Sequence, residues 1–324
     1  MLTASLPLPH RRTGDRVRFG LNATPMHTSW PEYLRLCQEA EALGFDSFWV
    51  FDHFVPGPAS PEGACLECFT TLAALASVTR RIQLGALVLG VTYRNPALVG
   101  KMGAMLDVIS GGRFILGMGA GWYRLEHEMY GIPFPPNATR VRMLDEALAL
   151  IRTLWTHQPA SFQGRYYTLK DALTDPPPVQ QPYPPLLVGS RGEQLGLRVV
   201  ARHADQWNTA AALEEATRLS AVLDACCREV GRDPATVERT AIVLQTIAAS
   251  PTAERAQQER LEAIFRQPFA ALAPRVLSGP PEAAVERLRA YREAGFTHFM
   301  FSLFAPYDLA GLKVLAEQVL ARLR

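Results

Sequence analysis

Eight short apolar segments recur along this chain, and segments with helical periodicity lie between most of them. The apolar segments cover residues 18–23, 47–51, 82–89, 113–118, 185–190, 205–209, 240–249 and 298–303. The helical segments cover residues 31–43, 70–78, 96–110, 139–155, 193–203, 213–230 and 281–294. Strands that alternate with helices are typical of a parallel sheet, and eight such units predict an α/β fold, the (β/α)8 TIM barrel.

An internal similarity supports the closure of this barrel. Residues 41–51 (EALGFDSFWVF) and 292–302 (REAGFTHFMFS) each contain the end of a helix, a Gly-Phe turn and a strand. The second copy lies near the end of the chain, where the last barrel strand is expected. We therefore expect the last strand to pair with the first.

The length of 324 residues allows two domains, but an α/β barrel of this size is commonly one. We expect a loose N-terminal tail over residues 1–15 and a single barrel domain over residues 16–324. Residues 131–185 depart from the alternating pattern and hold ten of the 25 prolines. Within them, residues 161–169 alternate around a glycine, which predicts a β-hairpin. We interpret the region as a helix followed by an insertion over the barrel mouth.

Composition and charge exclude several classes of protein. The net charge of +2 gives no field that would attract nucleic acid. Of the five cysteines, Cys65 and Cys68 form one CxxC pair without a second pair, so we expect no zinc or other metal. No apolar run is long enough to cross a bilayer, and no signal peptide follows Arg11 and Arg12. We expect a cytoplasmic enzyme that acts on a small molecule.

The candidate catalytic residues follow the second predicted strand. Active sites of parallel barrels lie at the carboxyl ends of the strands, and Asp52 and His53 stand at such an end. Histidine titrates near neutral pH and can donate or accept a proton. A loop histidine that is held only by structural hydrogen bonds is the alternative.

Two glycine-rich turns are candidate cofactor sites. The loop Gly119-Ala120-Gly121 follows the fourth strand, and Trp122 stands where a dinucleotide fingerprint would need its last glycine, so we expect no such fold. Gly189-Ser190-Arg191-Gly192 precedes a helix expected to begin near Glu193, an arrangement suited to a phosphate, although a plain turn would look alike. Trp122 and Trp207, with Trp49 and Phe51, are candidate walls for a planar ring. These features favour a flat redox cofactor with a phosphate tail.

Longer motifs make the chain resemble the luciferase-like monooxygenase superfamily, most closely its F420-dependent oxidoreductases. The motifs are GFDSFWVFDHF (44–54), the segment 70–122 with YRNPA and SGGRFILG, YGIPFPP (130–136), FQGRYY (162–167), PPLLVGSRGE (184–193) and ARHADQWN (201–208).

This resemblance implies a barrel with insertions and a cofactor ring at its mouth. It implies a cis peptide behind the ring at Leu87–Val88 and the cofactor phosphate at residues 189–192. His53 would transfer a proton, and Asp52 would orient the His53 ring. A homodimer would form through barrel helices. The apolar faces of residues 66–78 and 96–109 suit such an interface, and burial within the monomer would explain them equally well.

One residue departs from the pattern of the superfamily. Some sugar-phosphate dehydrogenases of this group carry a glutamate at the position of Trp122, so a sugar-phosphate substrate is in doubt and a more apolar one is favoured. Trp122 and Trp207 would shape the substrate side, and Glu126 would supply polar contacts. The resemblance thus implies hydride transfer between coenzyme F420 and a small organic substrate. An FMN-dependent monooxygenase or reductase and a non-catalytic flavin-binding barrel remain alternatives.

Overall fold

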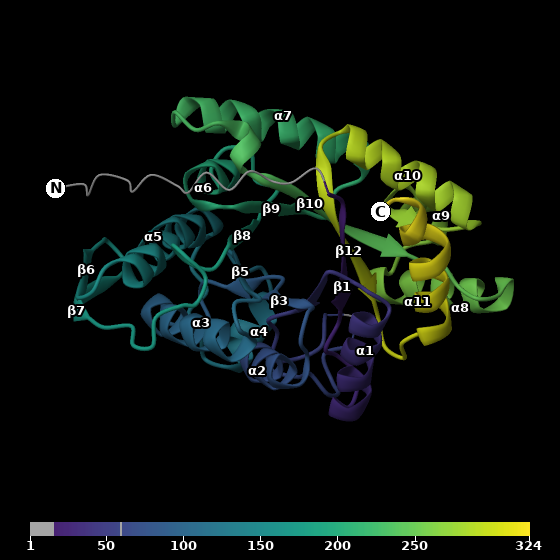
Figure 1. The fold of residues 1–324 in the computed structure, drawn as a ribbon, viewed down its shortest axis with the longest axis horizontal. Coiled ribbons are helices and arrows are strands. Elements are labelled where there is room, and N and C mark those ends of the chain that lie inside the picture. The colour runs from purple at the N-terminus through teal and green to yellow at the C-terminus, as the bar shows by residue number, and fades with distance from the viewer. Residues whose placement is uncertain (1–15, 59) are drawn as a thin grey trace.

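Eight parallel strands close into a barrel in the part of the chain that the structure, a computed structural model, describes: residues 16–58 and 60–324 (Figure 1). Around the barrel the strands are β1 (Arg18–Ala23), β2 (Ser47–Val50), β3 (Gln83–Ala86), β5 (Phe114–Gly119), β8 (Leu186–Gly189), β9 (Gln206–Thr209), β10 (Glu238–Gln245) and β12 (Phe296–Leu303). The predicted TIM barrel is confirmed. The expected tail, residues 1–15, lies outside the described residues.

The last strand closes the barrel against the first, as the internal similarity predicts. β12 pairs with β1 in parallel from Arg18 opposite His298 to Ala23 opposite Leu303. On its other side β12 pairs with β10, and β10 pairs with β9. Two short strands attach to this sheet, β4 (Leu89–Gly90) beside β5 and β11 (Val276–Leu277) beside β10.

Helices form the outer layer around the strands (Figure 1). The longer ones are α1 (Trp30–Ala42), α2 (Cys68–Val78), α3 (Pro96–Ser110), α5 (Asn137–Thr156), α6 (Gly196–His203), α7 (Leu213–Glu229), α8 (Pro251–Phe265) and α10 (Pro281–Glu293). Shorter ones are α4 (Arg124–Met129), α9 (Phe269–Leu272) and α11 (Leu309–Val314), with further helical turns at Pro234–Thr236, Ala273–Arg275, Leu315–Val319 and Leu320–Arg322.

The start of α1 shows how local sequence sets these boundaries. The side chain of Ser29 accepts from the backbone N–H of Glu32, and the Glu32 carboxylate accepts from the N–H of Ser29 at 3.0 Å. This capping box satisfies N–H groups that the first helical turn leaves free. Pro31 then fits the first turn, because it lacks an N–H that would need a partner.

Two parts of the apolar core lie inside and outside the barrel wall, and a third, small cluster joins Leu244, Leu261, Leu272 and Val276. The larger part lies between strands and helices and includes Phe48. The smaller part fills the barrel interior with Trp49, Leu87, Ile115, Leu187 and Met300. Because neighbouring residues of a strand face opposite sides, Phe48 meets the helices and Trp49 the interior. Trp49 therefore packs beneath the mouth, which corrects its expected place as a wall for a planar ring.

The predicted hairpin in the insertion is present, but it does not lie over the barrel mouth. β6 (Ala160–Gln163) and β7 (Thr168–Ala172) pair antiparallel and pack on α5 (Figure 1). The carboxylate of Glu146 in α5 accepts from the N–H groups of Arg165, Tyr166 and Tyr167 at 2.6–2.9 Å. Further along the chain, Gln180 donates hydrogen bonds to the carboxylate of Asp107 near the end of α3. The chain therefore returns along the outside of the barrel to the amino end of β8. The expected position of the hairpin is wrong, because Glu146 holds it against the outer layer.

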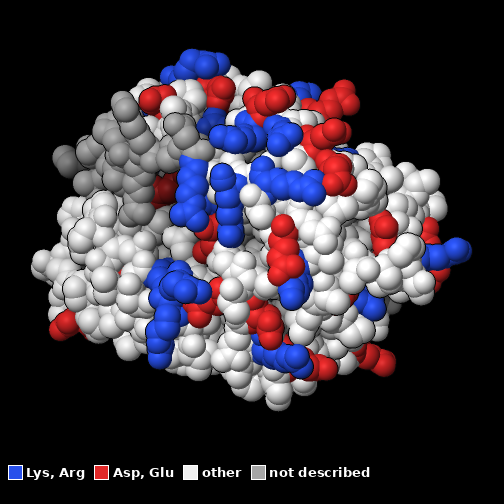
Figure 2. Space-filling model, turned by 45° about the vertical axis from the view of Figure 1, so that its right-hand side comes forward, with Lys and Arg blue, Asp and Glu red and all other residues white. Residues whose placement is uncertain are grey.

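The molecular surface carries mixed charge. Figure 2 shows basic side chains gathered in the upper half of one face, among acidic ones. Exposed pairs such as Arg322–Glu282 at 2.7 Å and Arg202–Asp145 at 2.9 Å contribute to this mixture. None of the helices in the described residues is both long and apolar enough to cross a membrane.

Candidate active site

A cavity of about 1080 Å³ opens where the carboxyl ends of the barrel strands meet. Its lining includes most of the residues that the sequence singles out: Asp52, His53, Leu87, Val88, Gly119, Ala120, Gly121, Trp122, Gly189, Ser190, Arg191 and Gly192. Phe51, Tyr93, Asn208 and Ile242 also line it, as does the start of α5. Segments far apart in sequence thus converge on one site, at the end of the barrel where catalysis is expected.

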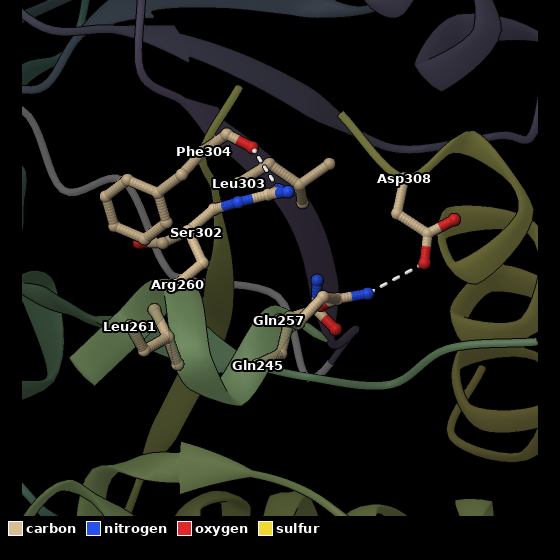
Figure 3. A pocket seen from close by; sticks show the side chains of 8 residues that line it. All are labelled: Gln245, Gln257, Arg260, Leu261, Ser302, Leu303, Phe304 and Asp308. Carbon is tan, nitrogen blue, oxygen red and sulfur yellow. Dashed lines mark hydrogen bonds between the residues drawn. The ribbon is translucent and has the colours of Figure 1, made fainter. Parts of the chain in front are cut away.

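Two smaller cavities lie away from this site. One of about 20 Å³ lies between α8 and the ends of β10 and β12, where Gln257 donates to Asp308 at 2.7 Å (Figure 3). That volume holds about one water molecule. The other, of about 500 Å³, lies at the opposite end of the barrel, where Arg16 pairs with Asp46 at 2.8 Å and Arg18 with Glu238.

The floor of the large cavity is built mostly from backbone. The Leu87–Val88 peptide is cis, as the family resemblance implies. Val88 lies close to β5 and β8: a Cβ on Gly119 would lie 2.7 Å from a methyl group of Val88, and one on Gly189 would lie 3.3 Å away. Glycine is therefore required at Gly119, where a side chain would collide with the floor. The result is a broad surface against which a flat ring can lie.

A buried arginine holds the loop that follows β5. Arg140 of α5 donates to the carbonyl oxygens of Ala120 at 3.1 Å and Gly121 at 3.3 Å. Its guanidinium also lies over the ring of Phe134, 3.9 Å from the centroid. Sequence reasoning missed Arg140, because its position near the start of a helical pattern gives no sign of a contact with this loop.

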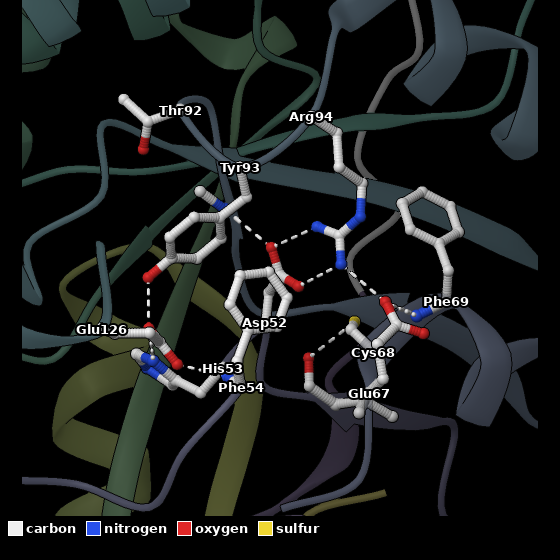
Figure 4. Close-up of polar contacts among 12 residues, drawn as sticks. Asp52, His53, Phe54, Glu67, Cys68, Phe69, Thr92, Tyr93, Arg94 and Glu126 are labelled. Atoms are coloured by element: carbon white, nitrogen blue, oxygen red, sulfur yellow. Dashed lines mark hydrogen bonds and ion pairs between the residues drawn. The ribbon is translucent and has the colours of Figure 1, made fainter. Parts of the chain in front are cut away.

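His53 is fixed by Glu126 of α4 (Figure 4). Its Nδ1 lies 2.9 Å from Oε2 of Glu126, which is fully buried. The same carboxylate accepts from the Tyr93 hydroxyl and from the backbone N–H groups of Phe54 and Val55, the last at 3.1 Å. Because a carboxylate can only accept, Nδ1 is the donor, which leaves Nε2 of His53 for the cavity.

These contacts keep Glu126 ionised. Burial raises the pKa of the Glu126 carboxyl, but hydrogen bonds from His53, Tyr93 and the Phe54 backbone outweigh it and lower the pKa below its usual value. Burial and the hydrogen bond to Glu126 raise the pKa of the Tyr93 hydroxyl well above its usual range. Glu126 does not line the cavity, so its expected contact with substrate is corrected: it acts on His53.

Asp52 has a different partner from the one expected. Arg94 donates to both of its carboxylate oxygens, at 2.8 and 2.9 Å, and the N–H of Gly90 donates at 3.0 Å. Arg94 also reaches Glu67 at 2.6 Å, and Figure 4 shows it between the two carboxylates. The expectation that Asp52 orients His53 is therefore wrong, because its oxygens hold the loop after β3. Burial raises the pKa of Asp52, and Arg94 opposes that shift.

The two candidate tryptophans have different surroundings. Trp122 is 61% exposed, lines the cavity and meets the His53 ring edge-on with centroids 5.6 Å apart. Trp207 is fully buried, packs against Phe296 and donates its indole N–H to the carbonyl of Ser190 at 2.8 Å. Trp207 thus supports the turn after β8 from behind and does not line the cavity, which corrects its assignment to the substrate pocket.

The glycine-rich turn after β8 lies at the cavity, but the helix begins later than expected. Gly192 donates its N–H to the Ser190 hydroxyl at 3.3 Å, and α6 starts at Gly196, not near Glu193. Arg191 is exposed, lines the cavity and makes no hydrogen bond or ion pair with any described residue. A free guanidinium beside backbone N–H groups fits the phosphate of a bound cofactor.

No group of three or more metal-ligating side chains occurs among the described residues.

Comparisons with known proteins agree with this architecture. Residues 13–298 match the sequence model of a family described as luciferase-like monooxygenase. An F420-dependent glucose-6-phosphate dehydrogenase of Amycolatopsis mediterranei (strain U-32) is 29% identical over 315 residues, covering 88% of this chain and 92% of that protein. A phthiodiolone/phenolphthiodiolone dimycocerosates ketoreductase of Mycobacterium bovis (strain BCG / Pasteur 1173P2) is 30% identical over 250 residues, covering 70% and 64%. The structure of an F420-dependent secondary alcohol dehydrogenase superposes with a TM-score of 0.83 at 22% identity, covering 94% and 99%.

Proposed function

The chain belongs to the luciferase-like monooxygenase family, and on this premise we propose that it is an oxidoreductase that depends on coenzyme F420. It transfers hydride between C5 of the deazaflavin and a small organic substrate. The relatives named as F420-dependent dehydrogenases, which match most of the chain, support this choice of cofactor. One observation carries the proposal: a histidine fixed by a buried carboxylate stands in the wall of a wide cavity whose floor is backbone.

The cofactor is held by three segments of the cavity. Leu87, Val88 and the loop Gly119–Gly121 line the cavity and would hold its ring. The turn Gly189–Gly192 would hold the phosphate, with Arg191 as its cation. These segments suit a ring with a phosphate tail, because they offer an open floor at one end and free donors at the other.

His53 is the proton donor and acceptor of the reaction. Its Nδ1–H is held by Glu126, so Nε2 is the atom that would exchange a proton with the substrate oxygen. A bound deazaflavin would supply the hydride chemistry. Asp52 keeps Arg94 and the loop after β3 in place. Trp122 forms the substrate side of the cavity, in contact with His53.

A fluorescence titration of the purified protein with coenzyme F420 and, separately, with FMN tests the cofactor. We expect micromolar or tighter binding of F420 and weaker binding of FMN. The reverse preference, with oxygen consumed in the presence of reduced FMN, would assign the protein to a flavin monooxygenase or reductase. Tight binding without redox turnover of any substrate would leave a non-catalytic flavin-binding barrel.

The active protein is a homodimer formed through α2 and α3. These helices expose Val78, Leu98, Met105 and Ile109, each at least 39% accessible, and the last three follow one face of α3. Light scattering should give twice the chain mass, and Leu98→Lys with Met105→Lys should give a monomer. Leu173→Lys, at an exposed position outside α2 and α3, is the control.

The five cysteines, all without disulfides, suit a reducing compartment such as the cytoplasm.

A further inference from the structure

The side-chain amide of Asn208 is held in one orientation at the cavity. Asn208 belongs to β9, is only 4% exposed and lines the cavity. Its Nδ2 donates to Oγ1 of Thr240 at 2.9 Å and to Sδ of Met300 at 3.3 Å. The Thr240 hydroxyl donates its own proton to the carbonyl of Trp207 at 2.9 Å, so towards Asn208 it is an acceptor. Because both neighbours of Nδ2 are acceptors, the amide cannot turn over without placing Oδ1 against them.

The amide oxygen of Asn208 is presented to the cavity without a partner. No described residue donates a hydrogen bond to this Oδ1, and the atom is not sealed inside the protein, as the unpartnered Oδ1 of Asn22 is. A ligand that displaces water from such an acceptor must supply a donor of its own, or the acceptor is left unsatisfied in a secluded site. The orientation of Asn208 therefore selects for a ligand that places an N–H or O–H group here.

Asn208 lies beside the part of the floor that we assign to the cofactor ring. It pairs in register with Gly189 of β8, and a Cβ on Gly189 would lie 3.3 Å from the methyl groups of Val88. Neighbouring strands are about 4.8 Å apart, so a flat ring over Val88 and Gly189 would bring one edge to Asn208. In an oxidised deazaflavin, the pyrimidine edge carries one donor, the imide N–H, between two carbonyl oxygens. That donor complements the free Oδ1 of Asn208.

We propose that Asn208 binds the imide edge of the deazaflavin, with Oδ1 accepting from the imide N–H. The proposal rests on the F420 dependence proposed above and deepens it by naming a residue that orients the ring. Thr240 and Met300 are positioning residues, since they act through the amide of Asn208. Because the imide and C5 belong to one rigid ring, a contact that holds the imide also restricts the position of C5 relative to His53.

Equilibrium titrations with oxidised F420, and with F420 methylated on its imide nitrogen, test this contact without turnover. Asn208→Ala should weaken the binding of F420 about tenfold, because the imide N–H loses its acceptor in a secluded site. The unmodified protein should bind the methylated cofactor at least about tenfold more weakly than F420, since the methyl group replaces the donor and meets Oδ1. In Asn208→Ala the methyl group enters the space that the amide leaves, so this discrimination should fall to about twofold or less.

Two further variants control for effects on the fold. Asn22→Ala is the matched control, because Asn22 is a buried asparagine of β1 that donates to Ser302 at 3.2 Å and does not line the cavity. It should bind F420 with the affinity of the unmodified protein. Asn208→Leu keeps most of the side-chain volume without the acceptor and should lose F420 affinity as Asn208→Ala does, which separates the lost hydrogen bond from an effect of empty space.

The outcomes that contradict the proposal are distinct from a failure of the proposed function. Unchanged F420 affinity in both Asn208 variants, or equal discrimination against the methylated cofactor in Asn208→Ala and the unmodified protein, would overturn the proposal. A raised KM for substrate with unchanged F420 affinity would also overturn it, because Oδ1 would then accept from the substrate. Failure of F420 to bind the unmodified protein would instead reject the proposed function, and the role of Asn208 with it.

Discussion

His53 and Asp52 are neighbours in sequence but belong to separate hydrogen-bond networks. Consecutive side chains at the end of an extended segment leave the backbone in different directions, so the two do not meet. Closeness in sequence therefore predicted the wrong partner for His53. Its actual partner, Glu126, lies 73 residues further along the chain. The motif YRNPA contains both Tyr93 and Arg94, but nothing in its letters tells which carboxylate each side chain reaches.

Removing the imidazole tests the role of His53. His53→Ala should lower turnover by about 10²-fold or more, the usual contribution of a general acid or base. Steady-state rates measure the loss, and a fluorescence titration with F420 measures whether the cofactor still binds. His157→Ala, at an exposed position outside the cavity lining, is the control. Turnover that persists in His53→Ala at the original rate would reject the assigned role.

Arg191 is the residue on which phosphate binding depends most directly. Arg191→Ala should weaken F420 binding at least about tenfold, because a charge-assisted hydrogen bond contributes roughly 1.5–3 kcal/mol. Arg198→Ala is the matched control, since Arg198 lies on α6 and pairs on the surface with Glu229 at 3.2 Å. Titrations of both variants at the same salt concentration make the comparison. Equal weakening in the two variants would point to a general effect of charge and not to a phosphate contact.

Strands were the elements easiest to predict, because strands of a parallel barrel are buried on both faces and form continuous apolar runs. The expected and observed bounds of β1, β2, β5 and β9 differ by one residue at most. α8 was missed, since Leu261 is its one buried apolar residue and its periodicity is weak. Trp207 was misplaced, because neighbouring residues of a strand face opposite sides: Asn208 faces the cavity, so Trp207 faces the outer layer.

The contact between β5 and the bend at Val88 gives a prediction at the scale of elements. Gly119→Ala places a methyl group 2.7 Å from Val88, so the variant should lose about 1–3 kcal/mol of unfolding free energy and bind F420 more weakly. Urea denaturation and the cofactor titration measure the two effects. Gly57→Ala is the control, because a Cβ there meets nothing within 4 Å. If the Gly119→Ala protein is as stable as the unmodified protein and binds F420 normally, the prediction is wrong, and Val88 in the cavity floor can move to accept the added methyl group.

The whole molecule is expected to lose stability in acid through a histidine sealed inside the barrel. His298 of β12 is fully buried, and its Nε2 lies 2.7 Å from the hydroxyl of Ser47. Burial, with a smaller effect of Arg18, lowers the pKa of His298 well below its usual value of 6.5. Below pH 6.5 the unfolded chain therefore binds a proton that the folded barrel does not, so stability falls as the pH falls.

His298→Gln removes this proton-linked term while keeping a polar side chain near Ser47. Between pH 7.5 and 5.5 the unmodified protein should lose about 1 kcal/mol more unfolding free energy than the variant, since each pKa unit corresponds to about 1.4 kcal/mol. Urea denaturation at the two pH values gives the difference. His203, whose pKa burial also lowers against Asp145, is present in both proteins and cancels. His157→Gln, at an exposed position, should follow the unmodified protein. Parallel losses in His298→Gln and the unmodified protein would mean that the barrel interior admits the charged imidazole, together with the water needed to solvate it.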